Sequence, residues 1–138
     1  MKWIILSGIL IVIFPFCNEN SDGKSAPFID SNKKYKDYIK AIPGKSDSIP
    51  QKISQRGEVL IAYADCYSCH SIDKRSKGPA FKDIAKRYPV NDGYIALLAR
   101  RVIVGGSGAW GYSVMTPHAD LPEEDAKTMV KFILSLKE

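Results

Sequence analysis

Several patterns are missing from this sequence of 138 residues, and each absence excludes a class of protein. Apolar and polar residues alternate nowhere in a regular way, so no β-strand is expected. Lysine and arginine are scattered, which excludes the basic stripe of a nucleic-acid-binding domain. The longest apolar run, residues 3–16, is shorter than the roughly 20 residues of a membrane-spanning helix. The sequence has no internal repeat, and its length suits one domain with appendages.

Residues 1–16 have the pattern of a signal peptide, with a positive start followed by the apolar run. Cys17 stands alone at the boundary between this run and a polar segment. Such a boundary resembles the lipobox of bacterial lipoproteins, in which Cys17 would carry the lipid and become the first mature residue. Phe16 departs from that motif, because a small residue normally precedes the cysteine. We predict a lipid anchor at Cys17; the alternatives are an uncleaved apolar anchor and a free or disulfide-linked cysteine.

Residues 17–53 are rich in Ser, Lys, Asp and Pro and are expected to form a tether. One part of this segment, residues 31–42, has helical spacing of its apolar side chains. Ser31 is available as an N-cap, and the Pro-Gly pair at 43–44 would stop the helix. We expect a short helix that packs on the following domain, and the alternative is a transient amphipathic turn.

Residues 54–138 form the predicted domain, in which apolar residues recur at helical spacing. Helices are expected around residues 58–64, 81–88, 92–104 and 122–137, and the glycines at 105 and 106 would end the third. The fold class is therefore all-α. Short helices in a domain of this size bury little apolar surface, so a flat apolar cofactor is expected at its centre.

The middle of the chain carries a cofactor attachment motif, because residues 66–70 read Cys-Tyr-Ser-Cys-His. Two thiols three positions apart on one helical turn can add to the two vinyl groups of a haem. His70 then lies under the iron and supplies a nitrogen ligand. Since no other C-x-x-C exists, we predict one haem c, covalently bound through Cys66 and Cys69. Pro79 is expected to pack on the His70 side, where a backbone carbonyl near it would hold the imidazole N–H.

The second axial ligand is expected from the C-terminal half of the chain. Met1 lies in the signal segment, and Met129 falls on the apolar stripe of the last helix, where it would fill the core. Met115 remains, in a loop that Pro117 biases toward extended backbone. We predict Met115 as the ligand, and the alternative is a Met115 that only fills the core. His118 lies in the same loop, and geometry alone does not exclude it as a ligand.

Residues 106–111 match G-x-G-x-x-G, the fingerprint of a dinucleotide site. That site needs a preceding strand and a following helix, whereas here a helix precedes and a proline-containing loop follows. We expect these glycines to let the backbone pass close to the haem edge. Trp110 could donate its N–H to a haem propionate, and Arg101 could pair with one. The alternatives are a Trp110 that fills the core and an Arg101 that is a solvated surface charge.

From about residue 57 to residue 136 the chain resembles the short bacterial branch of the class I cytochromes c. The resemblance rests on residues 66–70, Lys-Gly-Pro-Ala at 77–80, residues 106–111 and Met-Thr-Pro at 115–117. It implies a small helical fold around a covalent haem, with His70 and Met115 on the iron. Trp110 and Arg101 match positions that contact propionates in that branch. His118 departs from it, because a small amide that supports the methionine sulfur is common there.

The implied function is an electron carrier, not an enzyme, that shuttles single electrons between membrane and periplasmic redox enzymes. Its partners would be a terminal oxidase, a reductase or a periplasmic dehydrogenase. A haem enzyme or gas sensor with a displaceable methionine is the first alternative, although the chain offers no obvious distal acid–base pair. A zinc or dithiol protein is the second, although adjacent Cys69 and His70 bind one metal poorly and no βαβ pattern is present.

Overall fold

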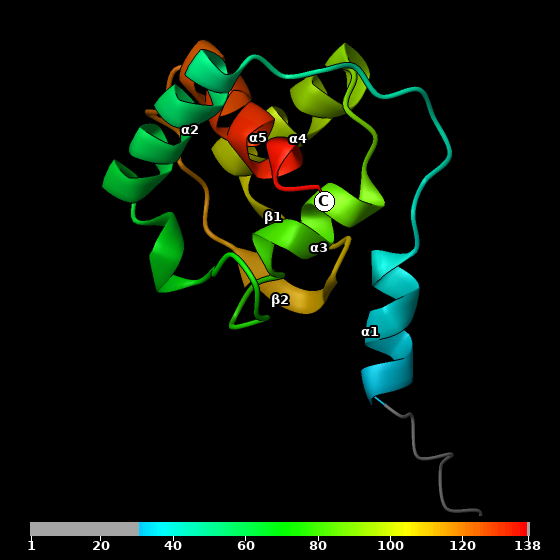
Figure 1. Ribbon diagram of the computed structural model, residues 1–138. Helices are drawn as coiled ribbons and strands as arrows, with labels where there is room; N and C mark the ends of the chain where they lie inside the picture. Colours follow the sequence, from blue (N-terminus) through cyan, green and yellow to red (C-terminus); the bar gives the residue numbers. More distant parts are fainter. Residues whose placement is uncertain (1–30, 138) are drawn as a thin grey trace, which may run out of the picture.

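The computed structural model describes residues 31–137, which form short helices and one small hairpin (Figure 1). In chain order the elements are α1 (Ser31–Ile39), α2 (Gln51–Tyr63), the 3₁₀ turn η1 (Cys66–Ser68), α3 (Phe81–Arg87), α4 (Asp92–Val104), β1 (Gly106–Gly108), β2 (Gly111–Met115) and α5 (Glu123–Ser135). The predicted signal segment and Cys17 lie outside the described residues. Among the described helices, none is long and apolar enough to cross a membrane.

Local signals set the helix ends close to where the sequence predicts them. α4 begins after Asn91, whose side-chain oxygen accepts a hydrogen bond from the backbone N–H of Tyr94 at 3.1 Å. This N-cap satisfies a donor that the first helical turn leaves unpaired. The helix ends at Val104, and the next residue, Gly105, has a φ of 71° in the left-handed region that favours glycine. The mostly helical fold expected from the sequence is confirmed.

The expectation of no strand is corrected by the hairpin β1–β2. Its strands are antiparallel and pair Gly106 with Met115 and Gly108 with Gly111. Three glycines of this hairpin have positive φ, namely Gly106, Gly108 and Gly111. Positive φ lets the backbone reverse within a few residues. β1 is a three-residue, glycine-rich strand and β2 has only five residues, so neither shows a sustained alternation of apolar and polar residues in the sequence.

α2 packs closely against α5, the helix that also packs against α3 and α4 (Figure 1). Gly57 of α2 is buried at their contact, where an added Cβ would overlap the Thr128 carbonyl oxygen and lie 2.7 Å from Phe132 Cβ. Glycine therefore permits the close approach of the two helices. Two clusters of buried apolar residues surround this pair: Ile61, Phe81, Met129, Phe132 and Ile133, and Tyr88, Val90, Ile95, Ala99, Ala126, Val130 and Leu134.

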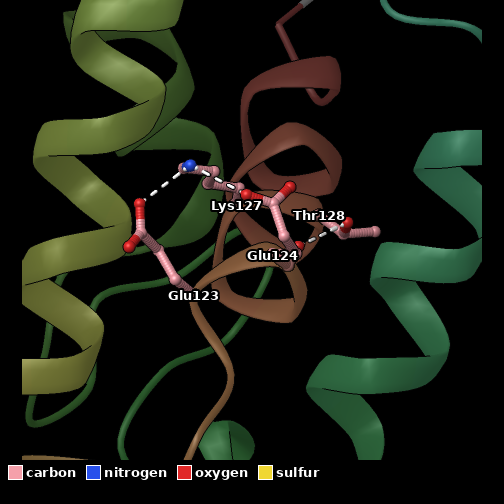
Figure 2. Close-up of polar contacts among 4 residues, drawn as sticks. All are labelled: Glu123, Glu124, Lys127 and Thr128. Carbon is pink, nitrogen blue, oxygen red and sulfur yellow. Dashed lines mark hydrogen bonds and ion pairs between the residues drawn. The ribbon is translucent and has the colours of Figure 1, made fainter.

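The first turn of α5 is acidic, which suits the positive end of the helix dipole (Figure 2). Lys127 Nζ lies 2.8 Å from a carboxylate oxygen of Glu123 and 2.9 Å from one of Glu124. The hydrogen bond and charge of Lys127 lower the pKa of Glu124. Thr128 Oγ1 donates to the backbone carbonyl of Glu124 at 2.8 Å (Figure 2). These exposed contacts fix the start of the helix and contribute little to overall stability.

The segment between α1 and α2 lies along the domain (Figure 1). The backbone N–H of Ile42 donates to the Arg87 carbonyl, and that of Asp47 donates to the Val90 carbonyl, both at 2.8 Å. The side chain of Ile42 packs, partly buried, against the apolar cluster that includes Val90. Residues before position 54, where the predicted domain begins, therefore also pack on the domain.

Candidate functional site

One cavity of about 670 Å³ lies between the helices and the hairpin. The structure brings together in its lining all the site residues predicted within the described part of the chain: Cys66, Cys69, His70, Pro79, Arg101, Trp110 and Met115. Much of the remaining wall is apolar, with Ile61, Phe81, Ile84, Leu98, Val102, Val130 and Ile133. Cys17, the predicted lipid anchor, falls outside the described residues.

The motif at residues 66–70 forms a tight turn directly after α2. Asp65 starts it with a left-handed backbone conformation, at φ 58°. The backbone N–H groups of Cys69 and His70 both donate to the Cys66 carbonyl, at 3.2 and 3.0 Å. This turn brings both thiols and the imidazole to one cavity. Burial raises the pKa of the Cys66 thiol.

His70 is held in one orientation by its neighbours. Its Nδ1 lies 2.8 Å from the Pro79 carbonyl oxygen. Because a carbonyl oxygen only accepts, Nδ1 donates and Nε2 keeps its lone pair for a metal. A Cβ at Gly78 would overlap the imidazole, so glycine is required for this approach. The Phe81 ring stacks near the imidazole, with centroids 5.2 Å apart and planes inclined by 18°.

Met115 reaches the cavity from the hairpin, at the end of β2. Its carbonyl oxygen sits so close to Gly105 that a Cβ there would overlap it. His118 also lines the cavity, and its backbone N–H lies 3.2 Å from the Val102 carbonyl and 3.1 Å from that of Ile103. The Nδ1 atom of His118 is buried and, within the described residues, has no hydrogen-bond partner. Both candidates for a second ligand therefore line the same cavity.

Arg101 and Trp110 line the cavity through different local contacts. Arg101 Nη1 donates to the Gly105 carbonyl at 3.0 Å, which closes the C-terminal end of α4 while the side chain stays exposed. Trp110 is partly buried and packs against two tyrosine rings of α1 at centroid distances of 6.4 and 6.5 Å. Trp110 is thus neither a fully buried core residue nor a free surface ring.

Sequence reasoning missed several residues of the cavity wall, among them Met129 and Arg75. Met129 was expected only in the core; it is 2% exposed and also lines the cavity. Its helical spacing marks a buried face but does not tell a core from a cofactor pocket that continues it. Arg75 lines the cavity from an irregular loop, and no pattern in the sequence marks its position.

The residues of the cavity fit a haem. Cofactor pockets have volumes of roughly 300–1,000 Å³ and mostly apolar walls with a few polar groups, as here. Two thiols and an imidazole on one turn match the chemistry of covalent attachment and iron ligation. By contrast, no group of three or more His, Cys, Asp or Glu side chains within the described residues is placed to hold a metal ion.

Comparison with known proteins agrees with this site. Residues 54–137 match the sequence model of the cytochrome c family. Cytochrome c-551 of Pseudomonas denitrificans is 41% identical over 81 residues, which cover 59% of this chain and 98% of the relative. Cytochrome c-552 of Hydrogenobacter thermophilus is 35% identical over 85 residues, which cover 62% of this chain and 86% of the relative.

The fold is also similar to a solved structure. The crystal structure of wild-type Nitrosomonas europaea cytochrome c552 superposes with a TM-score of 0.55 at 36% sequence identity. The match covers 58% of this chain and 99% of that structure. The chain therefore belongs to the cytochrome c family, as an electron-transfer protein with covalently bound haem c and not an enzyme.

Proposed function

We propose that this protein is an exported mono-haem cytochrome in which His70 and Met115 would hold the haem iron. One observation carries the proposal: Cys66, Cys69, His70 and Met115 all line one cavity. Haem c, when bound, supplies an iron that alternates between the ferric and ferrous states. The residues around the haem determine its position and whether the ferric or the ferrous state is favoured.

The attachment side of the pocket has three separate roles. Cys66 and Cys69 would form the thioether bonds to the haem, and His70 Nε2 would bind its iron. The hydrogen bond from His70 Nδ1 to the Pro79 carbonyl, 2.8 Å long, orients the ring and raises its basicity as a ligand. A thioether from Met115 favours ferrous iron more than a second imidazole would, so the proposed ligand pair predicts a fairly high potential.

Arg101 and Trp110 bind the haem propionates in this proposal. Both line the cavity, and each is held by contacts within the protein. Arg101 uses one of its five N–H groups for the Gly105 carbonyl, so others remain to bind a carboxylate. The indole N–H of Trp110 is a donor only, which suits a propionate oxygen.

The redox partners are proteins that meet the molecule at the cavity edge. Val114 of β2 lines the cavity and is 76% exposed, and Tyr112, two residues earlier on the same strand, is 89% exposed. Electron transfer across such an encounter face needs no substrate pocket. We infer partners among the terminal oxidases, reductases and periplasmic dehydrogenases. A location outside the cytoplasmic membrane, tethered through Cys17, follows from the predicted signal segment.

The proposal is tested on the purified holoprotein by redox titration and carbon monoxide binding. A low-spin spectrum in both oxidation states, with a reversible one-electron transition, is expected if both axial positions are filled. The reduced protein should then bind carbon monoxide only weakly. Rapid, tight binding of carbon monoxide by the reduced wild-type protein would instead indicate an open iron and a haem enzyme or gas sensor.

A further inference from the structure

Helix α1 lies outside the family match at residues 54–137, yet it contacts the wall of the haem cavity. The Tyr35 hydroxyl donates to Asp83 Oδ2 at 2.5 Å. The guanidinium carbon of Arg75 lies 4.3 Å from the centre of the Tyr35 ring, close enough for a cation–π contact. Arg75 itself lines the cavity. Tyr35 therefore links α1 both to α3 and to a residue of the cavity wall.

Tyr38 makes a second set of contacts, one turn further along α1. Its ring centroid lies 6.5 Å from that of Trp110, and the ring of Tyr35 lies 6.4 Å from the same tryptophan. Arg87 completes the group: its Nη1 donates to the Tyr38 carbonyl, and its guanidinium carbon lies 5.2 Å from the centre of the Trp110 ring. Trp110 is thus held by two tyrosine rings and one cation, and it also lines the cavity.

The residues that follow α1 also contact the domain. The chain after α1 lies along the domain, where the backbone N–H groups of Ile42 and Asp47 donate hydrogen bonds to carbonyls of residues 87–90. Ser46 Oγ accepts from the backbone N–H of Val90 at 3.1 Å. Pro89 is buried, and a Cβ at Gly44 would come within 2.9 Å of its ring. Contacts along the whole segment fix the position of α1.

We propose that α1 is a second layer of the haem pocket, in which Tyr35 and Tyr38 are positioning residues for Arg75 and Trp110. This inference rests on the proposed function, because it assumes that Trp110 faces a haem propionate. Without the Tyr38 ring, Trp110 loses packing on its outer side and water reaches the pocket edge. Water near the haem favours the ferric state, since solvent access to a metal site controls its potential. The tyrosines therefore keep the potential high without touching the haem.

The test uses the reduction potential of the full-length holoprotein for Tyr38→Ala, Tyr38→Phe and the control Lys36→Ala. Lys36 lies on the same helix with its side chain exposed. Tyr38→Ala should shift the one-electron equilibrium constant about threefold toward the oxidised form. At 59 mV per tenfold change, this lowers the reduction potential by about 28 mV. Tyr38→Phe keeps the ring and should retain the wild-type potential, as should Lys36→Ala. Tyr35→Phe, which removes only the hydroxyl bond to Asp83, should show a smaller shift in the same direction.

Amide hydrogen exchange provides a second measurement that does not depend on the haem ligands. Tyr38→Ala should speed exchange at the N–H groups of Ile42 and Asp47 while the core of α5 stays protected. A Tyr38→Ala protein with the wild-type potential would overturn the proposal, even if its melting temperature fell, because α1 would then only stabilise the fold. Failure of the proposed iron ligation would be seen separately, as a missing sulfur-to-iron band in the wild-type spectrum.

Discussion

The Nδ1 atom of His70 donates a hydrogen bond to the carbonyl oxygen of Pro79 at 2.8 Å, and Gly78 lies directly against the imidazole. The backbone N–H of Gly78 also donates to the Cys69 carbonyl at 2.8 Å. The loop after the attachment motif thus folds back on the motif. It fixes the plane of the imidazole and leaves the lone pair of Nε2 for a metal.

Gly78→Ala tests this relationship. The added methyl group overlaps the imidazole, so His70 must move and its bond to the Pro79 carbonyl must weaken. We expect a lower reduction potential and a growing high-spin fraction, because partners behind a ligand alter metal binding by about 10–100-fold. Absorption and magnetic resonance spectra of the holoprotein measure both effects. Gly93→Ala, at an exposed position in the first turn of α4, is the matched control and should leave the spectrum unchanged. A Gly78→Ala spectrum identical to that of the control would contradict the account.

Gly57→Ala tests the contact between α2 and α5. A Cβ at this position meets the backbone of Thr128 and the side chain of Phe132, so the helices must separate. Forcing an extra methyl group into such a contact costs about 1–3 kcal/mol. Urea unfolding of the holoprotein should show a lower free energy of unfolding by that amount, whereas Gly93→Ala should not lower it. An unchanged midpoint for Gly57→Ala would show that the helices are not in close contact.

The stability of the protein at high pH should depend on Tyr35. Burial and the hydrogen bond to Asp83 raise the pKa of Tyr35 to about 12 from its ordinary value of 10.0. Between these values the folded state holds a proton that the unfolded state has lost, so stability falls as the pH rises. Below about pH 10 the contribution is fully present.

We therefore expect wild-type protein to lose more stability than Tyr35→Phe between about pH 10 and 12. Because solvent screens a partly exposed side chain, the difference should be about 1 kcal/mol or less. Unfolding by urea at several pH values measures it. Parallel pH profiles for the two proteins would show that the Tyr35 hydroxyl does not keep its proton in this environment.

Cys17→Ser tests the proposed lipid anchor. If Cys17 carries the lipid, the variant should lose the anchor and move the haem protein from the membrane to the soluble fraction. Haem staining of the separated fractions measures the distribution. A variant that stays in the membrane would instead indicate that residues 3–16 remain as an uncleaved anchor. Ser21→Ala, in the polar segment after Cys17, serves as the control and should leave the distribution unchanged.

Features determined by neighbouring residues could be predicted from the sequence. Asn91 and Gly105 define the two ends of α4, and the motif at residues 66–70 carries its chemistry within five positions. The β1–β2 hairpin could not be predicted, because glycine conformation and not side-chain alternation determines it. The partners of α1 could not be predicted either. Helical spacing indicates a helix there, but only the tertiary structure brings Tyr38 against Trp110.

The central claim is that Met115, and not His118, binds the iron opposite His70. Both side chains line the cavity, and the buried Nδ1 of His118 has no hydrogen-bond partner in the described structure, so the two must be separated by experiment. The most direct measurement is the far-red sulfur-to-iron absorption band of the oxidised holoprotein, recorded for Met115→Ala and His118→Ala. We predict that Met115→Ala loses the band and binds carbon monoxide when reduced, while His118→Ala keeps the band with a modest shift of potential. The account would be contradicted if the wild type lacked this band and if, of the two variants, only reduced His118→Ala bound carbon monoxide. That result would establish bis-histidine ligation.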